Sequence, residues 1–187
     1  MKFTLSKQFI KLKSNKNEKG FTLIELLVVV SVIAVLSGLI LSVVSTGGIR
    51  SKARDNQRKA DLKKIQVALE LYFSDFRQYP ASSAWVAITG SDSLSNALRP
   101  ASGSGTVYLN SIPVDPVSTV GSNPCVATNR GYYYRTSSTN SRTYVLATVM
   151  EVPTSATEGL CTNLNNWNAI NGGTCSANVS CYGVENP

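Results

Sequence analysis

The chain has 187 residues, a net charge of +7 and no histidine. This length suits one domain with appended segments. Without histidine, the common Ser–His and Cys–His nucleophile arrangements are excluded. No pair of acidic residues has a spacing typical of acid–base catalysis, and no phosphate-binding loop is present. We therefore predict a protein that is not an enzyme and that has no cofactor.

The positive charge is concentrated at the N-terminus. Residues 1–20 contain six lysines and one acidic residue, which gives +5, whereas the rest contains 12 basic and 10 acidic residues, which gives +2. A removable leader would carry most of the charge. The net charge of the chain is therefore only weak evidence that its partner is a nucleic acid.

The leader is followed by Gly20 and by an apolar segment, residues 21–44, whose one charged residue is Glu25. A helix needs about 20 apolar residues to span a bilayer, and the core of a signal peptide has only about 7–15. An ionised carboxylate there costs roughly 3 kcal/mol or more near the bilayer centre, so we expect a specific partner for it. Cleavage after Gly20 would create an amine on Phe21, and this amine in another copy of the chain is a natural partner.

Glu25 also has a local interpretation. Thr22-Leu23-Ile24-Glu25 has the spacing of a capping box, in which both side chains bind free N–H groups at a helix start. Capping explains an acid near the start of a helix, but not its position after a basic leader and a glycine. We favour the assembly role, with which capping is compatible.

Residues 50–76 contain no proline or glycine and have an apolar stripe with helical spacing. The stripe consists of Leu62, Ile65, Leu69, Tyr72 and Phe76. A helix running unbroken from Phe21 to Phe76 would be weakest at Gly38, Gly47 and Gly48. The basic residues between Arg50 and Lys64 are expected to form a solvated face near lipid headgroups, in preference to a DNA-binding groove.

The composition changes after Pro80 to small and polar residues. We predict a short helix over 93–98 and strands over 106–112, 131–135 and 142–152. Tyr132, Tyr133, Tyr134 and Tyr144 are expected to pack in this sheet. The tail, residues 153–187, is predicted to be loop-like. The predicted fold class is α+β, with the long helix packed on a small antiparallel sheet.

The four cysteines, all in the C-terminal part, have no metal-binding spacing. They are Cys125, Cys161, Cys175 and Cys181. An even number in a membrane-anchored chain indicates disulfides formed outside the cytoplasm, with three pairings open. A Cys161–Cys175 bridge, for example, would contribute about 3 kcal/mol in the chain-entropy model. Free buried cysteines are the alternative.

Residues 20–28, GFTLIELLV, resemble the class III signal of type IV pilins and type II secretion pseudopilins. The resemblance implies that a prepilin peptidase cuts after Gly20 and methylates Phe21. It also implies that Glu25 pairs with the N-terminus of a neighbouring subunit, and that the fold is type IV pilin-like.

The resemblance extends more weakly to the strand region of major pseudopilins, through Ile112–Pro116, Tyr132–Tyr134 and Tyr144–Leu146. In that subgroup an Asp-Pro-Trp-Gly turn is common. Here Val117 and Ser118 replace its last two residues, so we predict no metal site and interpret Asp115 as a turn residue.

These features predict a basic leader (1–20), a transmembrane and filament-core helix (21–48), an amphipathic helix (49–79) and a small β-rich region (80–187). The function expected from the resemblance is that of a prepilin, which polymerises with itself into a pilus or pseudopilus. Its other partners would be the prepilin peptidase, the filament assembly machinery and, before assembly, the lipid bilayer. The cysteines and the Gly20 junction favour a single-pass inner-membrane protein with its C-terminal domain outside, and then a surface filament.

Two alternatives remain open at this stage. One is a minor or competence pseudopilin that starts a filament or binds DNA. The other is a monomeric, membrane-anchored surface binding domain, which would have no need for cleavage at Gly20.

Overall fold

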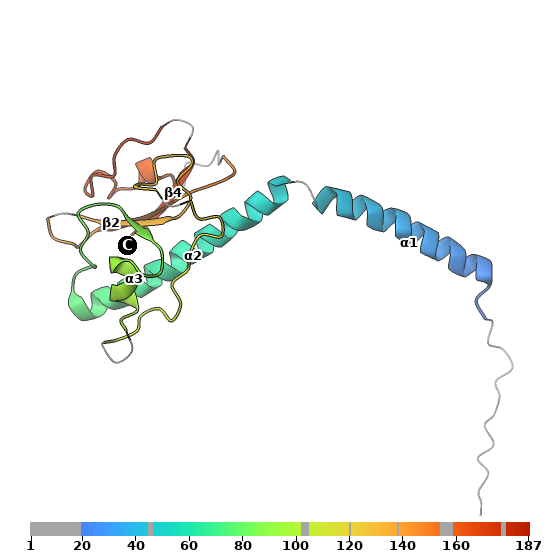
Figure 1. Cartoon of the computed structure of the whole chain (residues 1–187), viewed down its shortest axis with the longest axis horizontal. Helices are drawn as coiled ribbons and strands as arrows, with labels where there is room; N and C mark the ends of the chain where they lie inside the picture. The colour runs from blue at the N-terminus through green and yellow to red at the C-terminus, as the bar shows by residue number, and fades with distance from the viewer. Residues whose placement is uncertain are drawn as a thin grey trace, which may run out of the picture. The chain divides into compact units, whose positions relative to one another are not determined.

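The computed structural model describes residues 20–44, 47–101, 105–119, 121–137, 139–153, 159–176 and 179–187. The predicted leader, apart from Gly20, lies outside these residues. The chain divides into two compact units, Met1–Ser45 and Thr46–Pro187, and each is described here by itself. Figure 1 shows the helices and strands of both units.

The first unit contains helix α1, Leu23–Val44. Its residues are apolar on every side of the helix, and the large side chains described along it are exposed, as at Leu26, Ile33 and Leu36. No helix among the described residues meets the length and hydropathy required of a membrane span. Residues 45 and 46, where the predicted unbroken helix would continue, are outside the described part of the chain.

The second unit begins with helix α2, Gly47–Phe76. The predicted stripe is confirmed at Leu62, Ile65 and Leu69, which are almost completely buried. The helix ends where Arg77 adopts the left-handed conformation (φ 58°) and its N–H donates to the Phe73 carbonyl at 2.8 Å. This is a common way to close a helix, and Pro80 follows shortly after it.

A four-stranded antiparallel sheet follows, with the strands in the order β1-β2-β3-β4. The strands are β1 Val86–Ile88, β2 Tyr132–Thr136, β3 Tyr144–Val149 and β4 Cys181–Glu185. In this register Arg135 on β2 lies opposite Val145 on β3. Because side chains alternate along a strand, Tyr132 and Tyr134 point to one face and Tyr133 and Arg135 to the other.

The predicted elements after Pro80 are confirmed in part. Helix α3, Ser93–Leu98, has the predicted bounds, and Asp92 caps it by accepting from the Ser95 N–H at 3.0 Å. Two of the predicted strands correspond to β2 and β3. The strand predicted over 106–112 is wrong, because the N–H groups of Tyr108 and Leu109 instead donate to the carbonyl of Leu98 at the end of α3.

The tail prediction is wrong for its last part. It contains β4, which completes the sheet by pairing with β3. Gly183 lies within β4 and interrupts the alternation of apolar residues by which strands are predicted. This strand was therefore not apparent from the sequence. A Cβ there would lie 2.8 Å from Leu164 and 2.9 Å from the Leu146 carbonyl, so only glycine fits this close approach without a shift. Strand β1 was also not predicted, because it has three residues within a polar region.

The sheet has a core on each face. One face packs on α2 through Tyr134, Tyr144, Leu146 and Val184. The other face carries a smaller cluster that includes Val145, Ala147, Trp167 and all four cysteines. In Figure 1 α2 runs along one side of the sheet and the C-terminal segment covers the other. The thin β-region thus gains a second hydrophobic layer from its tail.

Candidate processing and assembly site

The start of α1 forms the predicted capping box. The Thr22 backbone N–H donates to Glu25 Oε2 at 2.9 Å, and the Thr22 hydroxyl donates to the same oxygen at 2.8 Å. In return, the Glu25 N–H donates to Thr22 Oγ1 at 3.2 Å. Among the described residues both hydrogen bonds to the carboxylate therefore reach Oε2, and Oε1 is the oxygen open to a second partner.

Gly20 and Phe21 immediately precede this box and are exposed. Phe21 is 88% exposed, and among the described residues other than the chain neighbours of Gly20 no atom lies within 4 Å of the position where a Cβ on Gly20 would sit. The Gly20–Phe21 bond therefore lies in an exposed, non-helical segment just before the Thr22 cap. The structure thus brings the predicted cleavage junction and Glu25 into adjacent parts of one helix start.

The surface of α1 is the second component of this region. Valine, leucine and isoleucine residues are more than half exposed on all sides of the helix, from Leu23 at 88% to Val32 at 51%. Burying one such side chain is worth about 1.5–3 kcal/mol. The helix therefore has a strong tendency to associate with an apolar environment or with other helices.

This arrangement is that of a protein with an N-terminal methylation motif. The family model described as the prokaryotic N-terminal methylation motif matches residues 15–41. The matched residues include the end of the leader, Gly20, Phe21, Glu25 and most of α1.

Several curated proteins are similar over a longer stretch. The type II secretion system core protein G of Pseudomonas aeruginosa is 31% identical over 101 residues, which cover 54% of this chain and 69% of that protein. The proteins of the same name from Aeromonas hydrophila and Escherichia coli (strain K12) are each 30% identical, over 105 and 109 residues. These cover 54% and 56% of this chain, and 68% and 70% of the relatives. No solved structure matches the chain.

The chain therefore belongs to the type IV pilin and type II secretion pseudopilin family, whose members are structural subunits and not enzymes. The methylation motif, the long helical N-terminal region and the α+β fold agree with this assignment.

An ion-pair network around Arg58 was not predicted from the sequence. Arg58 lies on α2 with its side chain fully buried, and it donates to Asp115 through Nε at 2.6 Å and Nη2 at 2.9 Å. Its Nη1 also contacts Asp55 at 2.7 Å and Glu151 at 2.8 Å. The network joins α2 to the turn at Asp115 and to the residues after β3.

Neighbouring groups complete this network. Arg54 pairs with Glu151 through two nitrogens, with Nε to Oε1 at 2.7 Å. The N–H groups of Glu151 and Val152 donate to the Asp55 carboxylate at 3.0 and 2.9 Å. Each buried charge thus has a partner, which is the condition under which such charges are tolerated.

The electrostatics of the network follow from these contacts. Hydrogen bonds from Arg54 and then Arg58 lower the pKa of Glu151 to about 2, although its burial acts in the opposite direction. Burial tends to lower the pKa of Arg58, but the bonds to Asp115, Glu151 and Asp55 outweigh it and raise the pKa. Both groups are therefore charged throughout the physiological range.

The network corrects the prediction of a solvated basic face. Of the basic residues between Arg50 and Lys64, Arg58 is buried, Arg54 is paired with Glu151, and Lys64 is paired with Asp61 at 2.8 Å. Only part of the cluster is therefore free for lipid headgroups or nucleic acid. The i,i+3 spacing of Asp55 and Arg58 was visible in the sequence, but their long-range partners were not.

Asp115 also has a long-range partner that was not visible in the sequence. It is a turn residue, as predicted, since its Oδ1 accepts from the Val117 N–H at 2.8 Å. Its carboxylate is also buried against Arg58, so a guanidinium occupies the position where a cation would sit. In the described ranges no group of three or more histidine, cysteine or acidic residues is arranged to hold a metal ion.

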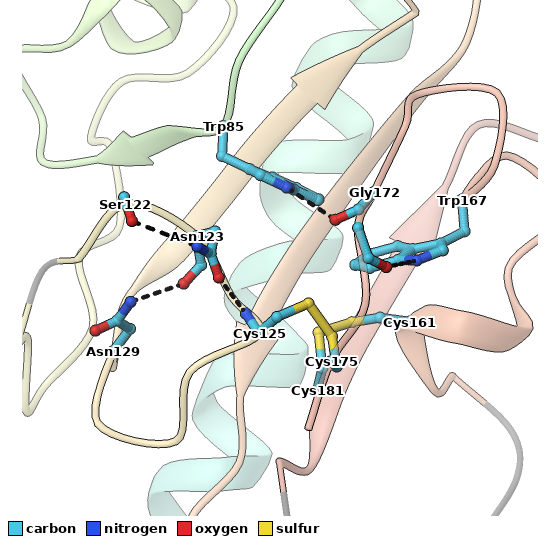
Figure 2. Close-up of a disulfide and its surroundings, with 11 residues drawn as sticks. Trp85, Ser122, Asn123, Cys125, Asn129, Cys161, Trp167, Gly172, Cys175 and Cys181 are labelled. Carbon is cyan, nitrogen blue, oxygen red and sulfur yellow. Dashed lines mark hydrogen bonds between the residues drawn. A yellow bond between two sulfur atoms is a disulfide. The ribbon is translucent and has the colours of Figure 1, made fainter. Parts of the chain in front are cut away.

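The cysteines form two disulfides, Cys125–Cys175 and Cys161–Cys181. This confirms the prediction of disulfides in the C-terminal region and selects one of the three pairings. The Cys161–Cys175 bridge used as an example does not form. In Figure 2 the two bridges lie next to each other on the outer face of the sheet, near Trp167.

Proposed function

We propose that this chain is a prepilin that is cleaved between Gly20 and Phe21, methylated on Phe21, and polymerised with copies of itself. The observation that supports this proposal best is the Gly20–Glu25 start of an all-round apolar helix within the matched methylation motif. On this proposal the helix is first a membrane anchor, with the globular unit outside the inner membrane, and then the core of an envelope or surface filament. The partners are the prepilin peptidase and the filament assembly machinery.

We assign Glu25 the task of fixing the position of each new subunit. Its Oε1 would accept from the Phe21 amine of a neighbouring copy, while Oε2 keeps its bonds to Thr22. A subunit in the wrong position would bury this carboxylate without a partner, which is strongly unfavourable. Only the correct position would then be stable.

Intact-mass analysis of the protein from producing cells tests processing. We expect the loss of residues 1–20 and the addition of one methyl group on Phe21. Full-length chain in assembled filaments would contradict the proposal. A Gly20→Val variant should remain uncleaved, because a branched side chain at the junction hinders access to a peptidase site.

Two variants of Glu25 test its role in assembly. Glu25→Gln keeps a side chain that can complete the capping box but removes the charge, whereas Glu25→Ala removes both. If the charge pairs with the Phe21 amine, both variants should insert in the membrane and both should give far fewer filaments. Normal filament yield from Glu25→Gln would show that capping is sufficient and would reject the pairing.

A further inference from the structure

A pocket of about 280 Å³ opens on the face of the sheet opposite α2. Segments far apart in the sequence line it: Trp85 before β1, Arg135 on β2, the loop at Asn123 and the loop 171–174. Its lining includes none of the residues of the processing site or of the Arg58 network. Its size is sufficient for one small ring-shaped molecule, somewhat below the usual range for drug-sized ligands.

Arg135 is the charged group of this pocket. Its Nε is buried and has no hydrogen-bond partner among the described residues. Arg54 and Arg58, by contrast, are bound by carboxylates. A guanidinium matches a carboxylate through two parallel bonds. In the described part of the chain no acidic side chain lines the pocket, so the Arg135 guanidinium is the charge that a ligand there would meet.

Trp85 supplies an aromatic wall. Its indole N–H donates to the Gly172 carbonyl at 3.2 Å, and its ring centre lies 5.5 Å from that of Trp167. Figure 2 shows Trp85 directed at Gly172, with Asn123 and Cys125 close by. Trp85 lines the pocket with its N–H already bonded, so a ligand there would contact its ring and not a free donor. The hydrogen bond to Gly172 and the contact with Trp167 hold the ring in place.

The loops that complete the pocket are fixed by covalent and steric means. Cys125 lines the pocket, and its partner Cys175 follows the lining residue Thr174. A Cβ on Gly172 would lie 2.3 Å from the Trp167 ring, so this loop approaches the indole as closely as a glycine allows. The pocket is therefore formed before any ligand arrives, which lowers the entropic cost of binding.

We propose that this pocket binds a uronic acid unit of an acidic polysaccharide. The carboxylate would bind Arg135, and the apolar C–H face of the sugar ring would pack on Trp85. The side chains of Asn171 and Thr174 would bind the ring hydroxyls. A neutral sugar leaves Arg135 unpaired, and a simple carboxylate leaves the Trp85 surface uncovered. A charged ring therefore suits the lining best.

Binding of methyl glucuronide to the full-length chain in detergent micelles tests this proposal. Methyl glucoside and propionate serve as the neutral ring and the ringless carboxylate. We expect saturable binding of the glucuronide, detected by tryptophan fluorescence and calorimetry, and at least about tenfold weaker binding of the other two. Equal affinity for the glucoside would overturn the role of Arg135, and equal affinity for propionate would overturn that of Trp85.

Two arginine variants locate the binding. Arg135→Gln should weaken glucuronide binding by about tenfold to a hundredfold. Arg142→Gln, which removes an exposed arginine outside the pocket, should leave it unchanged. Equal loss in both variants, or no glucuronide binding up to millimolar concentration, would overturn the proposal. If Arg135→Gln fails to fold, the three ligands compared on the unmodified chain still decide. The assay measures the subunit and is independent of polymerisation.

Discussion

α1 and α2 are both long α-helices with apolar surface, but they differ in what covers that surface. α2 buries an apolar stripe on the sheet and even buries Arg58, because carboxylates from two distant segments surround it. The side chains described along α1 have no such cover, and large apolar residues are exposed all round it. A helix with one apolar stripe finds its partner within its own chain, whereas one that is apolar all round needs a partner from outside.

Because of this difference, mutations in the two helices should affect two separate properties, the stability of the globular unit and filament assembly. Changes around α2 should alter the unfolding of the globular unit. Changes to the charge of Glu25 at the start of α1 should alter assembly and leave that unfolding unchanged. The predictions below, ordered from the largest expected effect to the smallest, test this separation.

Arg58→Ala should destabilise the globular unit most. It leaves Asp115 and Asp55 buried without their cation, and breaking a buried pair in this way costs about 3–5 kcal/mol. Chemical denaturation of the full-length chain in detergent measures the loss. Lys63→Ala, on the exposed face of the same helix, is the matched control and should change stability by less than about 0.5 kcal/mol. Similar values for the two variants would contradict the structural role of the network.

The disulfides should contribute next, and unequally. Cys125–Cys175 joins residues 50 apart and Cys161–Cys181 joins residues 20 apart. The chain-entropy model gives about 4 and about 3 kcal/mol respectively. The paired serine variants, Cys125→Ser with Cys175→Ser and Cys161→Ser with Cys181→Ser, measure each contribution by thermal unfolding. Labelling of all four cysteines in denatured, unreduced protein would contradict both bridges.

Acid should weaken the Arg58 network through Glu151. Its pKa is lowered from the usual 4.5 to about 2 in the folded protein, so its contribution is complete above about pH 4.5. As the pH falls from there toward 2, the unfolded chain takes up the proton first, and roughly 2–3 kcal/mol is lost. Denaturation curves measured across this range should show the loss. In Glu151→Gln this part of the pH dependence should be absent, and an unchanged acid profile would contradict the assignment.

The same contrast explains how far the sequence could predict the structure. Local patterns were sufficient for α1, α3, the stripe of α2 and the Thr22–Glu25 cap, since each depends on neighbours a few residues apart. β1 and β4 were missed because neither has a local pattern: β1 is short, and β4 contains Gly183. The groups that lie close to Gly183 are the Leu164 side chain and the Leu146 carbonyl, and these distant segments meet only in the folded chain.

The Arg58 ion-pair network also could not be predicted from local patterns. Arg58 and its acids resemble surface residues when taken one at a time, and the two partners on other segments, Asp115 and Glu151, are 57 and 93 positions away. The cysteine pairing likewise required the fold. At the processing site the sequence predicted the motif, and the structure added the geometry of the cap at Glu25. On the proposed function, the group that would complete this site is the Phe21 amine of another copy of the chain.

The smallest effect is expected from Thr22→Val, which separates capping from assembly at the start of α1. The change removes the hydroxyl that binds Glu25 but keeps the backbone N–H that donates to the same carboxylate oxygen. Losing such a cap costs a helix about 1 kcal/mol. We therefore expect a slight loss of helix signal in circular dichroism, unchanged unfolding of the globular unit, and filament yield close to that of the unmodified chain. Thr22→Ser keeps a hydroxyl and should behave as the unmodified chain does. If Thr22→Val abolished filaments as completely as Glu25→Ala, the local cap would be what assembly requires, and the charge of Glu25 would matter only through it.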